Sequence, residues 1–205
     1  MVVFPPEIRP LPTSKRGSGC ARPAVFFDRD DTLIENRTLP AEAMAGKAGD
    51  LADPAWVRPL PGAREACQCA VRLGYAVILV TNQGVAARGG ATLEQVEATC
   101  RRTIELLGPG IEACLACPFH PQGTGPMGLR REHPWRKPQP GMLLAAADLF
   151  GLDLKRSWMV GDAPRDVQAG VAAGLPPERC LKVGVKFGLG QAMEVISQRT
   201  AGVHG

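Results

Sequence analysis

The sequence predicts an α/β fold, a doubly wound parallel sheet with flanking helices. Short segments that are apolar throughout alternate with helical stretches long enough to cross over a sheet. Polar residues directly follow several of the apolar segments, at the edge where sheets of this kind bind ligands. The chain has 205 residues, 45% of them hydrophobic, which is enough to form one substantial core.

Four apolar segments are the predicted strands. They are residues 24–27, 75–80, 157–160 and 180–185. Each is short and lacks polar alternation, as expected for parallel strands that helices cover on both faces. The predicted helices between and beside them span residues 61–73, 93–107, 141–150 and 166–173.

The remaining segments define the predicted domain organisation. Residues 1–20 are rich in Pro, Ser and Gly, which predicts a flexible lead without a packed role. Residues 21–205 then form a single domain, interrupted by loop insertions at about 35–58 and 118–138. Loops of this length in a compact domain are often functional.

Composition narrows the function classes. The net charge of +4 is spread along the chain without a long Lys/Arg run, which suits a small anionic ligand and does not indicate nucleic acid. No stretch approaches the roughly 18 apolar residues of a membrane span, and residues 1–20 lack a hydrophobic signal core. We therefore expect a cytoplasmic protein that acts without a membrane, with its seven cysteines reduced or bound to metal.

The segment Asp28-Arg29-Asp30-Asp31-Thr32 follows the first predicted strand directly. Side chains at i and i+2 of an extended segment point the same way, so the carboxylates of Asp28 and Asp30 are aimed together. Such a pair repels unless a cation or a shared proton lies between them. The alternative is structural, because Asp and Thr also serve as turn and helix-capping residues.

Three further strings follow the later predicted elements: Thr81-Asn82-Gln83-Gly84, Arg136-Lys137-Pro138 and Gly161-Asp162-Ala163-Pro164-Arg165-Asp166. Taken singly, each has an ordinary explanation as a strand end, an exposed lysine or a turn. In this order, however, the four strings resemble the motifs of the haloacid dehalogenase (HAD) superfamily of phosphatases, over roughly residues 24–185.

The resemblance implies a phosphomonoesterase that works through an aspartyl-phosphate. Asp28 would be the nucleophile and Asp30 the general acid and base. Thr81 would hydrogen-bond a phosphoryl oxygen, and Lys137 would neutralise the developing charge.

The same resemblance implies Mg²⁺ as cofactor. The ion would be held by Asp28, the backbone carbonyl of Asp30 and Asp162, since it prefers oxygen ligands. Asp166 would support the metal site from behind.

Longer blocks resemble one branch of the superfamily, the D-glycero-D-manno-heptose 1,7-bisphosphate 7-phosphatases and the related histidinol-phosphate phosphatases, which carry loops and no large cap domain. The blocks are residues 27–30, 80–84, 87–89, 117–123, 136–142 and 159–162. The resemblance implies a small phosphorylated metabolite as substrate, and a monomer. In that branch Arg136 would recognise the substrate, Asn82 and Gln83 would line its pocket, and Asn36 would lie on the substrate loop.

The chain departs from this branch at its structural zinc site. The four ligand positions hold Cys117, Phe119, His133 and Trp135, and Phe and Trp cannot ligate zinc. A substitute set with suitable ligand types is Cys114, Cys117, His120 and His133. The alternative is that aromatic packing by Phe119 and Trp135 holds the loop without metal.

A second departure is Asp31, where the branch has Gly. A carboxylate beside the nucleophile either raises its pKa or faces solvent, and the sequence leaves both open. Histidinol phosphate or another small phosphate ester is the alternative substrate. A HAD-fold binding protein without catalysis is the alternative from a different class.

Overall fold

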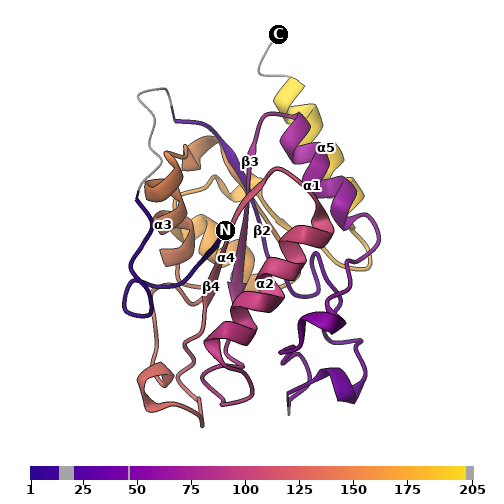
Figure 1. Cartoon of the computed structure of the whole chain (residues 1–205). Coiled ribbons are helices and arrows are strands. Elements are labelled where there is room, and N and C mark those ends of the chain that lie inside the picture. Colours follow the sequence, from indigo (N-terminus) through magenta and orange to yellow (C-terminus); the bar gives the residue numbers. More distant parts are fainter. Residues whose placement is uncertain (14–20, 46, 202–205) are drawn as a thin grey trace.

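A computed structural model describes residues 1–13, 21–45 and 47–201 of the chain. Its centre is a six-stranded, wholly parallel sheet in the order β1-β4-β3-β2-β5-β6 (Figure 1). The strands are β1 (Val2–Val3), β2 (Ala24–Phe27), β3 (Ala76–Asn82), β4 (Ile111–Cys117), β5 (Trp158–Gly161) and β6 (Cys180–Lys182). The predicted doubly wound α/β fold is confirmed.

Helices cover both faces of this sheet. The α-helices are α1 (Ala63–Arg72), α2 (Leu93–Leu107), α3 (Gly141–Phe150), α4 (Pro164–Ala172) and α5 (Leu189–Ala201). Short 3-10 helices are η1 (Ala41–Ala43), η2 (Pro54–Trp56), η3 (Met127–Leu129), η4 (Leu154–Arg156) and η5 (Pro177–Arg179). The helices α1, α2 and α5 cover one face, and α3 and α4 cover the other (Figure 1). No helix of the described chain is long and apolar enough to cross a membrane.

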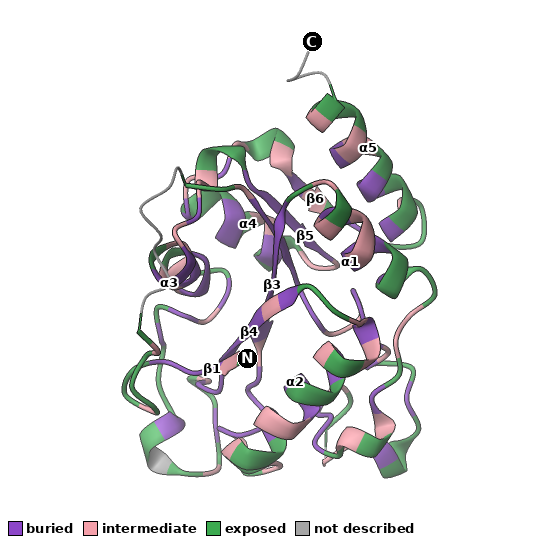
Figure 2. Ribbon diagram, turned by 45° about the horizontal axis from the view of Figure 1, so that its top comes forward, coloured by how far each residue is buried: buried purple, intermediate pink, exposed green. Residues whose placement is uncertain are grey.

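The buried strands are the centre of the hydrophobic core (Figure 2). All four residues of β2 are fully buried, which explains why the strand is apolar throughout. In the register of the sheet, Phe27 pairs with Leu79 of β3 and with Val160 of β5. The residues that follow these three strands therefore meet at one edge of the sheet.

The first residues of the chain correct the predicted flexible lead. Val2–Val3 forms β1 and pairs in parallel with β4, Phe4 is buried, and the amino group of Met1 donates to the carbonyl of Glu112. A two-residue edge strand is too short to show a sequence pattern, although its apolar side chains fill the core. The rest of the predicted lead, residues 14–20 with Cys20, lies outside the described residues.

The loop insertion at 35–58 is packed. It contributes to a small separate apolar cluster made of Ile34, Leu39, Ala43, Leu51 and Val57, and an isolated antiparallel bridge joins Met44 to Leu51. This cluster holds the insertion beside the edge of the sheet where β2 ends.

Candidate active site

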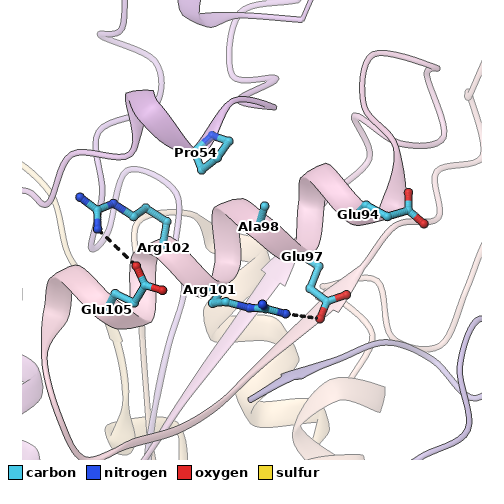
Figure 3. Close-up of a pocket in the computed structure, with 7 residues that line it drawn as sticks. All are labelled: Pro54, Glu94, Glu97, Ala98, Arg101, Arg102 and Glu105. Atoms are coloured by element: carbon cyan, nitrogen blue, oxygen red, sulfur yellow. Dashed lines mark hydrogen bonds and ion pairs between the residues drawn. The ribbon is translucent and has the colours of Figure 1, made fainter.

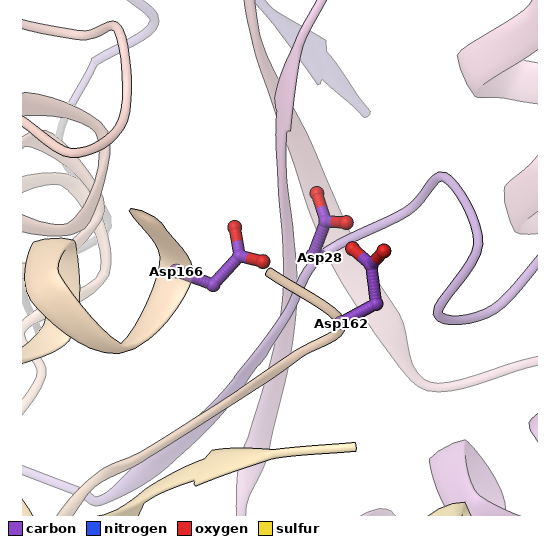
Figure 4. Close-up of side chains that lie close together, drawn as sticks. All are labelled: Asp28, Asp162 and Asp166. Carbon is purple, nitrogen blue, oxygen red and sulfur yellow. The ribbon is translucent and has the colours of Figure 1, made fainter. Parts of the chain in front are cut away.

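Side chains from two strand ends and from the first turn of a helix meet at the carboxyl edge of the sheet. Asp28 follows β2, and its backbone N–H donates to the carbonyl of Val160 at 2.9 Å. Asp162 follows β5, and Asp166 lies in the first turn of α4. The three carboxylates point toward one another (Figure 4). The sequence prediction that distant strand ends would bring these residues together is consistent with this geometry.

Lys137 compensates two of these negative charges. Its ammonium nitrogen lies 2.5 Å from Asp28 Oδ1 and 2.7 Å from Asp166 Oδ1, and it also donates to the carbonyl of Val80 at 2.8 Å. Burial lowers the pKa of Lys137, but the carboxylates of Asp28 and Asp166 more than offset this, so the pKa is raised overall. The lysine is therefore a buried cation fixed between the carboxylates of Asp28 and Asp166.

Asp28 is almost completely buried, and burial raises its pKa to about 7. The Lys137 ammonium lowers the pKa, whereas the carboxylates of Asp166 and Asp30 raise it further. Thr32 Oγ1 donates to the second carboxylate oxygen at 3.3 Å. A further cation is thus needed to keep Asp28 ionised well below neutral pH.

Asp166 is held in place by α4 and by Gly161. Its Oδ2 accepts a hydrogen bond from the backbone N–H of Ala163 at 2.9 Å, at the start of α4. A Cβ atom at Gly161 would lie 2.5 Å from the Asp166 carboxylate, so only glycine permits this approach. Since Lys137 and Ala163 already engage both oxygens, Asp166 supports the site from behind Asp28.

The carboxylates fit a divalent cation. Asp28, Asp162 and Asp166 each offer a ligand atom within 4.8 Å of the others. The Oδ1 atom of Asp162 is buried and receives no hydrogen bond from the described residues. A buried carboxylate oxygen without a donor is costly unless a cation meets it. Hard divalent ions take oxygen ligands of this kind.

Asp30 is oriented by four hydrogen bonds. Arg29 donates to Oδ1 from Nε at 3.1 Å and from Nη2 at 2.8 Å. Thr81 Oγ1 and Gln83 Nε2 donate to Oδ2 at 3.0 and 2.8 Å. The structure thereby places Gln83 against Asp30, where its amide positions the carboxylate, and joins Thr81 to the same group.

Asn82 connects the end of β3 to the segment of Lys137. Its Nδ2 donates to the Lys137 carbonyl and its Oδ1 accepts from the Lys137 backbone N–H, both at 2.9 Å. We predicted that Asn82 would line the substrate pocket, but in the structure its side chain positions the Lys137 backbone. A single side-chain amide thus pairs with both the backbone N–H and the backbone C=O of one residue.

The side chain of Asp31 stabilises the turn into the loop that follows it. It adopts the left-handed conformation with φ of +57°, and its Oδ1 accepts from the backbone N–H groups of Asn36 at 3.2 Å and Arg37 at 2.9 Å. The turn interpretation of this segment is therefore confirmed for Asp31. Asn36 itself donates from Nδ2 to the carbonyl of Gly49 at 3.0 Å.

Arg37 is a site residue that sequence reasoning missed. Its Nε lies 2.8 Å from Asp31 Oδ2, and its Nη2 contacts Asp162 Oδ2. A run of polar loop residues offers no spacing that singles out one arginine. The pair of Asp31 and Arg37, six positions apart and next to a nucleophile motif, was the available signal.

Comparisons with known proteins agree with this geometry. The HAD-hydrolase-like family model matches residues 134–187. A D-glycero-β-D-manno-heptose-1,7-bisphosphate 7-phosphatase of Mesorhizobium japonicum is 38% identical over 84% of this chain and 69% of its own length. The chain belongs to this family. It is a HAD-type phosphatase, a phosphoric monoester hydrolase.

Other family members and solved structures support this assignment. The 7-phosphatase of Salmonella typhi is 33% identical over 79% of this chain and 81% of its own length. A HAD-like phosphatase of Mesorhizobium loti has a TM-score of 0.72 at 34% identity and covers 90% of each chain. The D,D-heptose 1,7-bisphosphate phosphatase of B. bronchiseptica, solved with magnesium and phosphate, shares the fold with a TM-score of 0.63 at 24% identity, over 86% of this chain and 99% of its own.

Positive side chains gather at one side of the phosphatase site. A Cβ atom at Gly84 would meet Arg88 Nη1 and His120 Cδ2 at 2.9 Å and Arg136 Nη1 at 3.4 Å. Burial and the charges of Arg136, Arg88 and Lys47 lower the pKa of His120. Burial also lowers the pKa of Arg136, and the neighbouring arginine charges add to this effect. Arg136 is fixed by donating to the carbonyl of Phe119 at 3.1 Å.

The structure does not bring the predicted zinc set together among the described residues. Cys114 lies within β4 and hydrogen-bonds Cys100, and its pKa is raised well above the ordinary value by this bond and by burial. His120 Nδ1 accepts from the backbone of Gln122 instead. Among the described residues, the three carboxylates of the active site are the one group of three or more side chains able to share a metal.

Aromatic packing is present in this loop, as in the alternative considered from the sequence. The rings of Phe119 and His133 stack with centroids 4.1 Å apart and planes 8° apart. His133 Nε2 lies 3.0 Å from Glu7 Oε1, and its Nδ1 accepts from the backbone N–H of Trp135 at 3.1 Å. Phe119 and Trp135 are both buried. The loop is thus tied to the first segment of the chain, which the sequence interpretation had treated as unpacked.

Proposed function

We propose that the protein removes the phosphate at C7 of D-glycero-β-D-manno-heptose 1,7-bisphosphate. The observation that carries the proposal is the buried Asp28, which contacts Lys137 and lies beside Asp162 at the carboxyl edge of the sheet. Relatives that are 33–38% identical over most of the chain carry this activity in their names. Histidinol phosphate or another small phosphate ester is the second candidate, and a binding protein without catalysis is a third.

In the first step the Asp28 carboxylate attacks phosphorus. The bond between phosphorus and the sugar oxygen breaks, and a protonated Asp30 transfers its proton to the leaving alkoxide. Lys137 and the Thr81 hydroxyl stabilise the negative charge on the phosphoryl oxygens. Gln83 and Arg29 support this step because they hold the Asp30 carboxyl group at a fixed place beside Thr81.

In the second step water replaces the enzyme at phosphorus. Asp30, now a carboxylate, accepts a proton from the attacking water. The bond between phosphorus and the Asp28 oxygen breaks, so inorganic phosphate leaves and Asp28 is a carboxylate again. The two steps together consume one water and regenerate both side chains.

Asp28 and Asp162, with the backbone carbonyl of Asp30, would hold Mg²⁺, and Asp166 would orient Lys137 behind them. The bound ion would supply positive charge that favours the ionised nucleophile and the anionic substrate. The unpartnered buried oxygen of Asp162 supports this ligand role. Arg37, which contacts the other oxygen of Asp162, orients that carboxylate.

The positive group at Gly84 suits the second phosphate of a bisphosphate. The guanidinium groups of Arg136 and Arg88 supply its charge and converge on this glycine beside His120, and a guanidinium offers a planar fork of donors to phosphate. Arg88 is itself oriented by the buried Asp50, with Nε 2.9 Å from Asp50 Oδ2. Asn36, which lies in the loop insertion at 35–58, would border the substrate. Cytoplasmic location and a monomeric state stay predictions.

The test compares turnover of heptose 1,7-bisphosphate, heptose 1-phosphate, histidinol phosphate and a simple aryl phosphate, with and without Mg²⁺. We expect the highest kcat/KM for the bisphosphate, and activity that requires Mg²⁺. The Asp28→Asn variant should keep its fold by circular dichroism and lose turnover of every ester. A higher kcat/KM for histidinol phosphate would overturn the substrate assignment, and full activity of Asp28→Asn would overturn the mechanism.

A further inference from the structure

A small pocket lies at the end of the sheet opposite the active site. Its lining includes Tyr75, just before β3, together with Arg156 of η4 and Arg179 of η5. Arg199 and Thr200 from the last turn of α5 complete it. Pro23, which also lines the pocket, precedes β2, whereas Asp28 follows that strand. The two sites are therefore separated by the length of β2, on the order of 15 Å at about 3.3 Å per residue.

Three of the residues that line this pocket are arginines. No Asp or Glu lines it, and the ion pairs among the described residues do not involve Arg156, Arg179 or Arg199. Like charges gathered in one pocket repel, which is unfavourable unless an anion joins them. The feature thus differs from an ordinary charged surface.

Another pocket shows the ordinary case. Beside α2, Arg101 pairs with Glu97 at 2.8 Å and Arg102 pairs with Glu105 at 3.2 Å (Figure 3). There each guanidinium already has a carboxylate within the same helix, so the pocket has little to offer an added anion. The pocket of Arg179 lacks such partners.

The donors of the Arg179 pocket are held before any ligand binds. Arg179 Nη1 donates to the carbonyl of Arg156 at 3.1 Å, and its guanidinium lies 4.8 Å from the centroid of the Trp158 ring. Arg199 lies over the same ring at 5.9 Å. The guanidinium groups of Arg179 and Arg199 therefore both lie over the ring of the buried Trp158.

Two hydroxyl groups extend this arrangement. Trp158 Nε1 donates to the Tyr75 hydroxyl at 3.3 Å, and that hydroxyl shares a hydrogen bond of 2.8 Å with Thr200 Oγ1. The chain of bonds fixes the wall of the pocket that faces the arginines. Preorganised donors bind an anion without the entropic cost of ordering long side chains.

We propose that this pocket is a second anion site, which binds inorganic phosphate through Arg156, Arg179 and Arg199. Its volume is about 180 Å³, below the roughly 300–1,000 Å³ of pockets for larger ligands, which suits a small tetrahedral anion. A dianion matches three cations that no carboxylate compensates. Phosphate is also the compound that any phosphatase releases, so it is present wherever the protein works. The site does not depend on the proposed heptose substrate.

The test follows Trp158 directly. Protein labelled with 5-fluorotryptophan is titrated with sodium phosphate without Mg²⁺, against sodium chloride at equal ionic strength, and fluorine NMR records the Trp158 resonance, assigned with Trp158→Phe. We expect a saturable shift with phosphate and none with chloride. No saturable shift up to 20 mM phosphate, a concentration chosen for the experiment, would overturn the proposal.

Variants separate this pocket from the active site. Arg179→Ala should weaken the phosphate-dependent shift at least tenfold, but it also removes a contact with Trp158. Arg156→Gln is the cleaner variant because its side chain is exposed, and it too should weaken the shift severalfold. Arg102→Ala, on the pocket of Figure 3, is the matched control and should leave the midpoint unchanged. An unchanged midpoint in Arg156→Gln and Arg179→Ala would mean that phosphate acts from elsewhere and would refute the site.

Discussion

Two buried parts of the molecule are held by different forces: the catalytic group of Lys137, Asp28 and Asp166 at the strand ends, and the aromatic pair of Phe119 and His133 in the loop at residues 118–138. Lys137 binds two carboxylates there within 2.7 Å, so the group is organised by charge. The loop is organised by the stacked rings of Phe119 and His133. The chemistry of phosphoryl transfer demands specific charged residues, whereas apolar and aromatic packing can fix a loop with many different side chains.

The largest effect is expected from replacing Lys137. We expect Lys137→Met to lower kcat by about 10³-fold, since a donor to the phosphoryl charge is lost. It should also lower the free energy of unfolding by about 3–5 kcal/mol, because Asp28 and Asp166 would stay buried without their cation. Urea unfolding followed by circular dichroism measures the second effect.

The matched control is Lys182→Met on β6, whose side chain is exposed. It should leave kcat unchanged, and the free energy of unfolding should stay within about 0.5 kcal/mol of the parent value. If Lys137→Met were no less stable than Lys182→Met, the two carboxylates would not depend on the lysine, and the catalytic group would not be organised by charge.

The loop should respond to loss of packing and ignore loss of metal. Phe119→Ala removes a fully buried ring that stacks on His133 and is expected to lower the free energy of unfolding by about 3–5 kcal/mol. A strong zinc chelator should not change the thermal midpoint of the parent protein. Phe187→Ala, at a half-buried position, is the control and should cost much less. A chelator that lowers the midpoint would show that a metal holds the loop after all.

The same contrast explains what the sequence allowed us to predict. Asp28 and Asp162 each follow an apolar strand, and Thr81 lies near the end of β3 after its apolar residues, so their meeting at one edge could be inferred from the order of strands and helices along the chain. The four predicted strands were found in the structure with small shifts at their ends. Local pattern and chain order are sufficient for such features.

The missed features depend on contacts between distant residues. Cys114 and Cys117 belong to the unpredicted strand β4, and they were interpreted as zinc ligands because cysteine fits both a buried strand and a metal site. Similarly, the bond between Glu7 and His133 joins segments 126 positions apart and has no local signature. The amphipathic helix α5 was missed as well, although it contributes Ala192 and Ile196 to the core.

The pH dependence of stability sharpens the electrostatic side of the comparison. The folded-state pKa of Asp28, about 7, lies above the value of 3.8 expected for the unfolded chain. The folded protein therefore binds more protons than the unfolded one between these values. Asp28 contributes stability that is fully present below pH 3.8 and is lost as the pH rises through about 7. The slope reaches at most about 1.4 kcal/mol per pH unit.

Urea unfolding of the metal-free protein at several pH values between 5 and 8 measures this slope. Asp28→Asn cannot titrate at this position, so the difference in unfolding free energy between variant and parent should grow with pH. Added Mg²⁺ should reduce the slope in the parent, because a cation beside Asp28 favours its ionised form. A difference that stays constant over this range would mean that Asp28 is already ionised at pH 5.

The smallest effect is expected at Asp31, which joins the catalytic group to the loop insertion at 35–58, here called the rim loop. Asp31→Asn keeps an acceptor oxygen for the backbone N–H groups of Asn36 and Arg37 and suits the left-handed conformation. It loses only the ion pair with Arg37, whose side chain is 63% exposed, so its stability should change by less than about 1 kcal/mol.

Asp31→Gly separates the two contributions of this residue. Glycine relieves the strain of a φ of +57° but removes the acceptor for both N–H groups. The gain and the loss are each about 1 kcal/mol, so the overall stability should again change little. Amide hydrogen exchange distinguishes the variants: Asn36 and Arg37 should exchange faster in Asp31→Gly and at the parent rate in Asp31→Asn. Equal protection in both variants would show that the rim loop holds its shape without the Asp31 carboxylate and is independent of the catalytic group.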